Sequence, residues 1–398
     1  MDSNPVMESL GRPLRLAVIG GGPGSFIGAM HRSAARLDGR YDLVAAVLSS
    51  DPDRSRSAAT DLGIADERAY GDVIELLEAE AERPDGVDVV AIMTPNDSHH
   101  RYIVAALERG FDVICDKPMT NTVAEALDVV HTVRTTGRVF CLTHNYTGYP
   151  LVRQARAMVE DGFLGTIRLV QVEYVQGGKA REDDPDPADG LPWRYDPVRG
   201  GPSLVMGDIG THAHNLARFI SRLDVTEVAA ELGHVAPDRL VDDYGAVMLR
   251  FENGARGSMW VTQTAAGVEN CLRIRVSGTG GTLEWSQEHP TELVFRPLDG
   301  PVRLFTPNGP DTLPPARRAS RIVAGHPEGF LEAFANVYAD AAEVIAARRA
   351  GTSPDPLAQW FPNELDGAIG VRFVEAAVTS SEAGGRWTNA ILDLDGDT

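Results

Sequence analysis

Short apolar runs alternate with amphipathic stretches over the first 150 residues. The apolar runs have the length of buried strands and lie at 14–19, 41–48, 87–93, 112–115 and 139–143. The stretches between them open on residues that commonly cap helices, namely Asp51, Asp72, Ser98 and Thr122. This alternation predicts βαβ units, so we expect an α/β protein whose first domain, residues 14–148, is a doubly wound parallel sheet.

The pattern changes after Pro150. One more helix is expected at 151–160, and then runs with an alternating apolar and polar pattern dominate, at 167–175, 226–232, 245–251, 255–264, 272–277, 282–285 and 292–295. They predict a largely antiparallel open sheet, followed by helices at 327–350 and 363–382. We expect a disordered tail at 1–13 and a substrate-binding and oligomerisation domain at 149–398, whose final helices pack back on the first domain.

Net charge limits the classes of partner. The formal charge is −20, which opposes binding to nucleic acid or to anionic membranes. No apolar stretch approaches the ~20 residues that a membrane helix needs. The polar opening lacks a secretory signal, so a cytoplasmic location is expected. The expected partners are a small molecule and other copies of the chain, with no nucleic acid and no membrane.

A glycine-rich turn, 20–25, follows the first apolar run and precedes a helix. Gly20 and Gly22 fit the dinucleotide-binding spacing, but the third fingerprint position falls on Ser25, and Gly28 implies a lengthened turn. The residues expected to contact a nucleotide here are Gly20, Gly22, Gly24, Ser25, Phe26 and Ile27. A tight turn that merely connects two elements is the alternative.

The residues after the second predicted strand do not determine whether NAD or NADP binds. Ser49 and Ser50 stand where an acidic residue usually holds the ribose 2′-hydroxyl of NAD. Arg54 could pair with a 2′-phosphate, whereas Asp51 could reach the hydroxyl, so NAD is expected and NADP is not excluded. Further cofactor contacts are expected from the segment after the third predicted strand, at Thr94, Pro95, Asn96 and His99, although these residues also suit turns and helix caps.

Lysine is rare in this chain. Only two of its 37 basic residues are lysines, and Lys117 lies in Asp116-Lys117-Pro118 directly after a predicted buried strand. An ammonium is a compact point charge with three donors, unlike the flat guanidinium. Lys117 is therefore the first candidate for catalysis, with Asp116 beside it near the cofactor. An ordinary cation at a strand end is the alternative.

A second candidate cluster lies at 200–215, where a helix is expected to begin near Gly207. Asp208 and His212 are four residues apart and share a helix face, so the carboxylate can orient the imidazole as a general base or acid. An acidic residue in a first helical turn beside a solvated histidine is the alternative. A metal site is not expected, because His212 and His214 diverge on a helix.

Four further residues are candidates for binding substrate. Trp193 and Arg194 end a long acidic loop at 178–201, where they could stack on a sugar or could latch the loop to its own aspartates. Tyr146 and His326 are weaker candidates, and a structural role at a strand end or a helix start is the alternative for each.

These motifs, in this order, resemble the Gfo/Idh/MocA family of nicotinamide-dependent oxidoreductases. The resemblance covers about 14–382 and rests on the glycine loop through His31 and on the segments 94–99, 116–118 and 207–212. It implies a Rossmann domain, then an α/β domain whose open sheet commonly packs against another subunit's, and substrates that are mostly cyclic sugars or polyols. By position, Lys117 matches the family's Glu-Lys-Pro lysine, and Asp208 and His212 match its Asp-x-x-x-His pair.

The departures concern the substrate. Asp116 replaces the usual glutamate, Asn215 stands where many members have an aspartate, and the segment 145–150 lacks an arginine often found before its proline. The long loop and the segment around His326 resemble a branch with inositol- and anhydrosugar-type dehydrogenases. Family membership does not choose the sugar.

The resulting hypothesis is NAD(P)-dependent oxidation of a secondary hydroxyl on a cyclic polyol, sugar or glycoside. The resemblance assigns proton transfer to His212, its orientation to Asp208, and stabilisation of negative charge on oxygen to Lys117. Two alternatives stay open: a non-catalytic NAD(P)-binding sensor or scaffold, and an NADPH-dependent reductase of C=N or C=C bonds. The substrate, the physiological direction, and the choice between dimer and tetramer are not determined.

Overall fold

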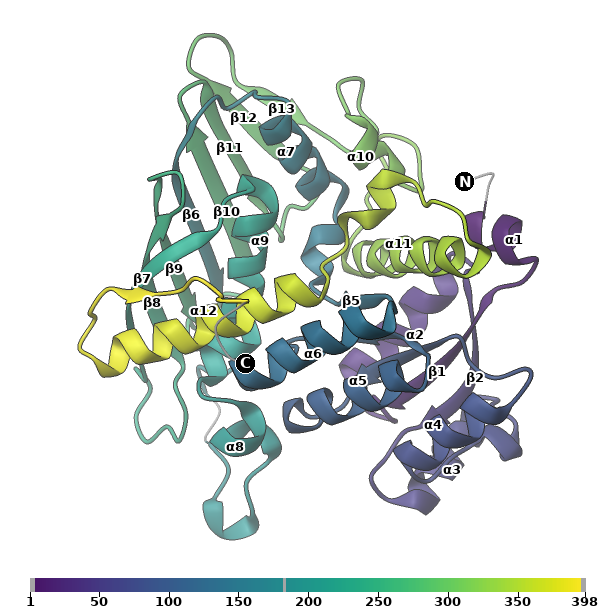
Figure 1. The fold of residues 1–398 in the computed structure, drawn as a ribbon. Coiled ribbons are helices and arrows are strands. Elements are labelled where there is room, and N and C mark those ends of the chain that lie inside the picture. The colour runs from purple at the N-terminus through teal and green to yellow at the C-terminus, as the bar shows by residue number, and fades with distance from the viewer. Residues whose placement is uncertain (1–3, 182–183, 395–398) are drawn as a thin grey trace. The chain divides into compact units, whose positions relative to one another are not determined.

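The computed structural model describes residues 4–181 and 184–394, and the chain divides into two compact units (Figure 1). Unit 1 comprises Met1–Thr120, Ala124–Gly148 and Phe330–Gly367, and unit 2 comprises Asn121–Val123, Tyr149–Gly329 and Ala368–Thr398. Residues 1–3 of the expected tail, residues 182 and 183 of the acidic loop and residues 395–398 lie outside the described part.

Unit 1 is built on five parallel strands in the order β2-β1-β3-β4-β5. Every residue of β3 is buried, so both faces of the sheet are covered, as its apolar sequence predicts. The strands are β1 (Leu14–Gly20), β2 (Tyr41–Val47), β3 (Val89–Met93), β4 (Asp112–Cys115) and β5 (Phe140–Leu142). The helices between them are α2 (Phe26–Leu37), α3 (Pro52–Asp61), α4 (Val73–Glu82), α5 (His99–Glu108) and α6 (Val123–Thr136). The predicted doubly wound sheet is confirmed.

The strand order reverses beside β1. The chain places β2 on one side of β1 and β3 on the other. In sheets of this type, ligands bind outside the carboxyl ends of the strands at such a reversal. The glycine turn leaves the carboxyl end of β1, and Thr94 directly follows β3, so both segments lie at the expected place.

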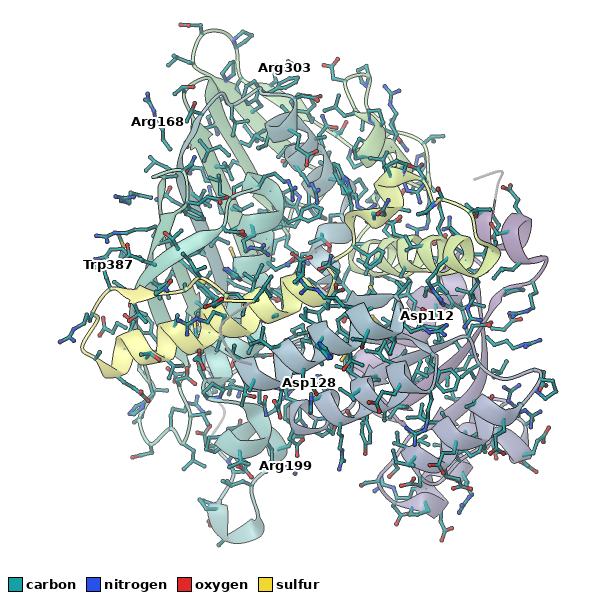
Figure 2. The ribbon with its side chains drawn as sticks, in the orientation of Figure 1. Asp112, Asp128, Arg168, Arg199, Arg303 and Trp387 are labelled. Carbon is teal, nitrogen blue, oxygen red and sulfur yellow. The ribbon has the colours of Figure 1, made fainter. Side chains whose placement is uncertain are left out.

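A helix from late in the sequence completes unit 1. Helix α11 (Phe330–Ala350) packs along α2, and its last turn carries Arg348 and Arg349. Arg348 Nη2 lies 2.7 Å from Oδ2 of Asp112, and Arg349 Nη1 lies 3.0 Å from Oδ1 of Asp88. Asp112 (Figure 2) is fully buried, and burial raises its pKa although the two arginines oppose that shift. Removing the arginines would leave a buried carboxylate without its cations.

The disordered tail expected at 1–13 is wrong for the part that is described. Residues Pro5–Leu10 form helix α1, and Asn4 caps it, because Oδ1 of Asn4 accepts the backbone N–H of Val6 at 3.1 Å. Val6 is fully buried, and α1 packs against α11. Asn4 and Pro5 are a local signal for this helix, a cap followed by a first-turn proline, and α11 supplies its tertiary support.

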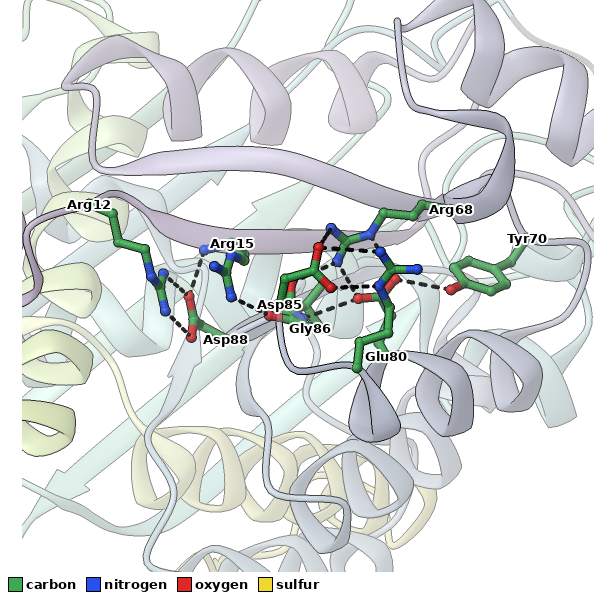
Figure 3. Close-up of polar contacts among 10 residues, drawn as sticks. Arg12, Arg15, Arg68, Tyr70, Glu80, Asp85, Gly86 and Asp88 are labelled. Carbon is green, nitrogen blue, oxygen red and sulfur yellow. Dashed lines mark hydrogen bonds and ion pairs between the residues drawn. The ribbon is translucent and has the colours of Figure 1, made fainter.

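A network of arginines and carboxylates holds the amino-terminal edge of the same sheet (Figure 3). Arg12 Nη1 lies 2.6 Å from Oδ2 of Asp88, which directly precedes β3. Arg68 pairs with the buried Glu80, and the Tyr70 hydroxyl donates to Glu80 Oε1 at 3.0 Å. Burial and the neighbouring Glu80 carboxylate raise the pKa of Tyr70 to about 12. These charged residues lie at the amino-terminal ends of the strands, and the glycine turn lies at the opposite, carboxyl ends.

Unit 2 contains a nine-stranded sheet in the order β13-β12-β11-β10-β6-β9-β8-β7-β14. Its pairs are antiparallel except β6 with β9, so the expected largely antiparallel sheet is confirmed. The strands are β6 (Ile167–Val175), β7 (Val225–Gly233), β8 (Tyr244–Phe251), β9 (Arg256–Thr262), β10 (Cys271–Gly278), β11 (Gly281–Ser286), β12 (Leu293–Pro297), β13 (Arg303–Phe305) and β14 (Thr388–Asn389). Its longer helices are α7 (Pro150–Glu160), α9 (Thr211–Ser221) and most of α12 (Glu364–Glu382).

The two faces of this sheet differ. Helix α9 packs on β6 and β10, on the face that holds Val170, Val247 and Met259. On the opposite face Leu169, Met248 and Trp260 are between 44 and 54% exposed, because successive side chains of a strand alternate between faces. A groove of about 850 Å³ runs over this exposed face.

The expected long loop at 178–201 and the later stretch at 299–324 contain short elements. The 178–201 loop includes the turns η4 (Pro187–Asp189) and η5 (Trp193–Tyr195) and the short helix α8 (Pro197–Gly200), and residues 299–324 include β13 and α10 (Pro314–Arg318). Arg239 Nη1 pairs with Asp184 Oδ1 at 2.8 Å, and both side chains are buried. The long loop is therefore anchored through Asp184. Across the described residues, the helices are all too short or too polar to cross a membrane.

Candidate active site

The glycine turn after β1 has the shape of a phosphate-binding loop. Gly20 and Gly24 both have a φ of +83°, a conformation that side chains other than glycine rarely adopt. A Cβ on Gly22 would lie 2.2 Å from the backbone oxygen of Leu48, whereas a Cβ on Gly24 would meet nothing within 4 Å. The turn therefore packs tightly against the sheet on one side and is open at Gly24, beside the amino end of α2.

Gly28 supplies the close helix contact that the fingerprint assigns to its third position. A Cβ on Gly28 would lie 2.0 Å from the backbone oxygen of Gly21. Ser25, which stands at the expected third position, is instead the N-cap of α2 and accepts the Gly28 N–H at 3.2 Å. Phe26 is 67% exposed and Ile27 is half-buried at the same helix start. The imperfect spacing thus reflects a longer turn. Its last glycine, Gly28, still allows the close approach of the helix to the turn.

The end of β2 does not decide between NAD and NADP. Ser49 is half-buried and Ser50 is exposed. The carboxylate of Asp51 caps α3 by accepting the backbone N–H of Arg54 at 2.9 Å, and the Arg54 side chain is exposed. Asp51 is therefore engaged at the helix start, while Arg54 is accessible to a ligand.

The segments after β3 and β4 are tied together by His99. Its Nδ1 lies 2.9 Å from the backbone oxygen of Pro118, and its Nε2 lies 2.9 Å from that of Thr94. Both ring nitrogens are thus engaged, so His99 positions these segments. Asn96 is buried in the turn η2 (Asn96–Ser98) that Pro95 precedes. Ser98 is the N-cap residue of α5 as expected, but its side chain makes no capping hydrogen bond, and its hydroxyl donates to Thr94 Oγ1 at 2.6 Å.

Asp116 organises the turn that carries Lys117. Oδ1 of Asp116 accepts the backbone N–H of Lys117 at 3.0 Å and the hydroxyl of Thr143 at 3.0 Å. Its own backbone N–H donates to Ile92 of β3 at 2.8 Å, so the turn is fastened to the sheet. Lys117 is half-buried at the carboxyl end of β4, on the edge where the glycine turn lies. Tyr146 is buried in the same unit, with its ring 6.2 Å from that of Phe330.

Asp208 and His212 lie in unit 2 and enter α9 through an irregular turn. The regular helix expected from Gly207 opens instead as a π-helical turn, η6 (Met206–Gly210), a feature that is frequent at functional sites. Oδ2 of Asp208 accepts the side-chain amide of Gln263 at 2.8 Å. His212 is 8% exposed, and its ring centroid lies 6.3 Å from that of Tyr174 on β6.

The remaining predicted substrate contacts lie on the outer segments of unit 2. Arg194 stacks on Trp193, with its guanidinium carbon 4.9 Å from the ring centroid. His326 is exposed, and its Nδ1 lies 3.3 Å from the backbone oxygen of Val323. The long loop is anchored by an ion pair between its own Asp184 and Arg239. Arg194 does not make this ion pair.

Comparison with known proteins now identifies the chain. A family model described as an oxidoreductase family with an NAD-binding Rossmann fold matches residues 14–144, and the GFO/IDH/MocA C-terminal domain matches residues 152–284. The uncharacterized oxidoreductase YfiI of Bacillus subtilis is 32% identical over 384 residues, which cover 95% of this chain and 97% of that protein. The chain belongs to the Gfo/Idh/MocA oxidoreductase family.

Relatives of known structure cover nearly the whole chain. An oxidoreductase from Sinorhizobium meliloti is 44% identical with a TM-score of 0.86, covering 94% of this chain and 99% of its own. An inositol dehydrogenase homolog from Azotobacter vinelandii, complexed with NADH and myo-inositol, is 35% identical with a TM-score of 0.86, covering 96% and 98%. Among curated proteins, the levoglucosan dehydrogenase of Pseudarthrobacter phenanthrenivorans matches a smaller part of the chain: it is 29% identical over 310 residues, which cover 70% of this chain and 75% of that protein.

The family match confirms an NAD-binding Rossmann domain and an oxidoreductase. The roles of individual residues stay predictions. Two features of the site were not predicted from the sequence. The packing role of Gly28 could have been predicted, because the spacing of the glycines already implied a longer turn that ends at Gly28. The bond from Gln263 to Asp208 has no signal in the sequence, because it joins residues 55 positions apart.

Proposed function

We propose that this family member oxidises a secondary hydroxyl of a cyclic polyol or sugar, with NAD as the cofactor. The observation that carries the proposal is the turn at Asp208, whose carboxylate is held beside the start of a helix that bears the nearly buried His212. Relatives whose names specify inositol and levoglucosan as substrates support a cyclic substrate with several hydroxyls.

The glycine turn fits the pyrophosphate of the cofactor. Gly24 leaves open space where a side chain would stand, and the amino end of α2 presents backbone N–H groups and the positive end of its dipole. We expect Gly20, Gly22 and Ser25 to cradle the phosphates, and Asn96 to contact the cofactor from the end of β3. The bound nicotinamide supplies the acceptor for the hydride that leaves the substrate carbon.

The side chains of the protein handle the proton and the charge. His212 takes the proton of the substrate hydroxyl as its carbon loses hydride, so the alcohol becomes a carbonyl. Asp208 orients the imidazole and stabilises the protonated ring. The ammonium of Lys117 stabilises the negative charge that develops on the substrate oxygen. The proposal requires Lys117 of unit 1 and His212 of unit 2 to face the same substrate.

Reduction of NAD and NADP in parallel tests this function. Absorbance of the reduced nicotinamide is followed with inositols, aldoses, glycosides and anhydrosugars. We expect NAD to be used in preference, and the exposed Arg54 makes NADP the direct comparison. Use of neither nucleotide with any alcohol, together with consumption of NADPH by an imine, would favour the C=N reductase instead. Binding of NADH with no turnover of any kind would favour a sensor.

Replacement of Lys117 tests the site itself. Lys117→Met and His212→Asn should each lower kcat by about 100-fold or more, because proton transfer and charge stabilisation each contribute on that scale, while NADH affinity changes little. Lys179→Met is the matched control, since Lys179, the other lysine, donates to the Tyr195 hydroxyl at 3.2 Å within the long loop. Unchanged turnover in Lys117→Met contradicts the role assigned to this residue.

The exposed face of the nine-stranded sheet supports assembly into a homo-oligomer. Leu169, Met248 and Trp260 are exposed apolar side chains on that face, and such patches commonly mark protein contacts. We propose that this face packs against a second copy. Sedimentation of the protein at the mass of one chain at micromolar concentration would contradict the assembly.

A further inference from the structure

Gln263 lies directly after β9 and is fixed in place by its backbone. Its N–H donates to the backbone oxygen of Asp243 at 3.1 Å, and its own backbone oxygen accepts the N–H of Lys179 at 3.0 Å. Its side chain is 5% exposed. A residue held on both sides of its backbone and buried has little freedom of rotamer, so its amide points in a defined direction.

That amide is aimed at Asp208. Nε2 of Gln263 donates to Oδ2 of Asp208 at 2.8 Å, and a hydrogen bond to an ionised carboxylate is stronger than one between neutral groups. A carboxylate accepts only, so the amide must present its N–H side. The amide oxygen Oε1 is then buried without a hydrogen-bond partner among the described residues. The side chain thus keeps its bond to Asp208 although its other polar atom is left unsatisfied.

Asp208 lies in a turn that contains two glycines. Glycines flank it at 207 and 210, and the space beside Gly207 is empty to 4 Å. The turn is π-helical, so the spacing between Asp208 and the α9 residues differs from that of a regular helix. The donor from Gln263 holds the carboxylate from outside this turn.

We infer that Gln263 is a positioning residue that holds the Asp208 carboxylate in the orientation needed to support His212. This inference rests on the function proposed above. Gln263 acts through Asp208, so its loss should lower the rate of the chemical step and leave the binding of substrate and cofactor nearly unchanged. A hydrogen-bond donor that lies behind a catalytic group fixes the geometry of that group.

Two variants separate the hydrogen bond from the size of the side chain. Gln263→Met removes the donor, and Gln263→Glu has nearly the same shape but replaces the amide N–H with a second acidic group, which repels the Asp208 carboxylate or shares a proton with it. We expect both to lower kcat by about 10- to 100-fold, a range typical of catalytic groups displaced by about 1 Å, with KM and the NADH dissociation constant within about threefold of wild type. Gln263→Glu also keeps the test valid if Gln263→Met fails to fold.

The matched control is Gln154→Met. Gln154 is a buried glutamine on α7, and its Oε1 accepts the Leu313 N–H at 2.8 Å. It should lose a comparable amount of thermal stability and keep kcat. An equal fall of kcat in Gln154→Met and Gln263→Met would overturn the inference, because general loosening would explain both.

Asp208→Asn and His212→Asn distinguish a failure of the positioning role from a failure of the proposed function. If both abolish turnover and both Gln263 variants keep wild-type kcat, the positioning role is wrong and the proposed function stands. If Asp208→Asn and His212→Asn also keep full turnover, the proposed function itself fails. A fall of kcat in the Gln263 variants with an unchanged KM supports the inference.

Discussion

Replacing Gly28 by alanine tests whether the glycine turn and α2 are packed so closely that no side chain fits between them. A new Cβ would lie 2.0 Å from the backbone oxygen of Gly21, where ordinary contacts begin at 3.4 Å, so the two segments must separate by about 1.4 Å. Overpacking of this kind typically costs about 1–3 kcal/mol. The gain in helix propensity from glycine to alanine is at most about 1 kcal/mol, so we expect a net loss of stability.

Gly370→Ala is the matched control, because Gly370 lies within α12 and a new Cβ there would meet only Thr211 Oγ1, at 3.5 Å. It should stabilise the protein by about 0.5–1 kcal/mol. Thermal unfolding measures the change in stability of both variants, and a fluorescence titration measures NADH affinity. Displacement of the turn in Gly28→Ala should weaken NADH binding at least about tenfold, or about 1.4 kcal/mol. A Gly28→Ala protein with wild-type stability and NADH affinity would refute the contact.

Two further predictions concern stability. Burial lowers the pKa of His31 to about 4, against about 6.5 in the unfolded chain. Between these values the unfolded state binds the extra proton, so stability falls as the pH drops from 6.5 to 4, and His31→Gln should flatten that slope in urea titrations. Arg239→Met leaves the buried Asp184 without the cation that it pairs with at 2.8 Å, which should cost about 3–5 kcal/mol and expose the long loop to limited proteolysis. An unchanged cleavage rate would contradict the anchoring role of Arg239.

The amino-acid sequence alone was sufficient for the order of elements and the type of each sheet. Apolar runs of strand length, an alternating pattern in the second half and glycines at turns are local signals, and the backbone responds to them locally. The glycine turn, Lys117, and the pair Asp208 and His212 became candidates in this way, because each motif is contiguous or spans one helical turn.

Only the tertiary structure could decide which distant segments meet. Helix α11 belongs to unit 1 because apolar side chains such as Phe334 and Ile345 pack in the core of that unit, and helix α1 packs against α11. The engagement of His99 by Thr94 and Pro118 and the donation from Gln263 to Asp208 also join separate segments. Such contacts depend on geometry that the packed core sets, and a single glutamine or histidine carries no local pattern that would reveal its partner.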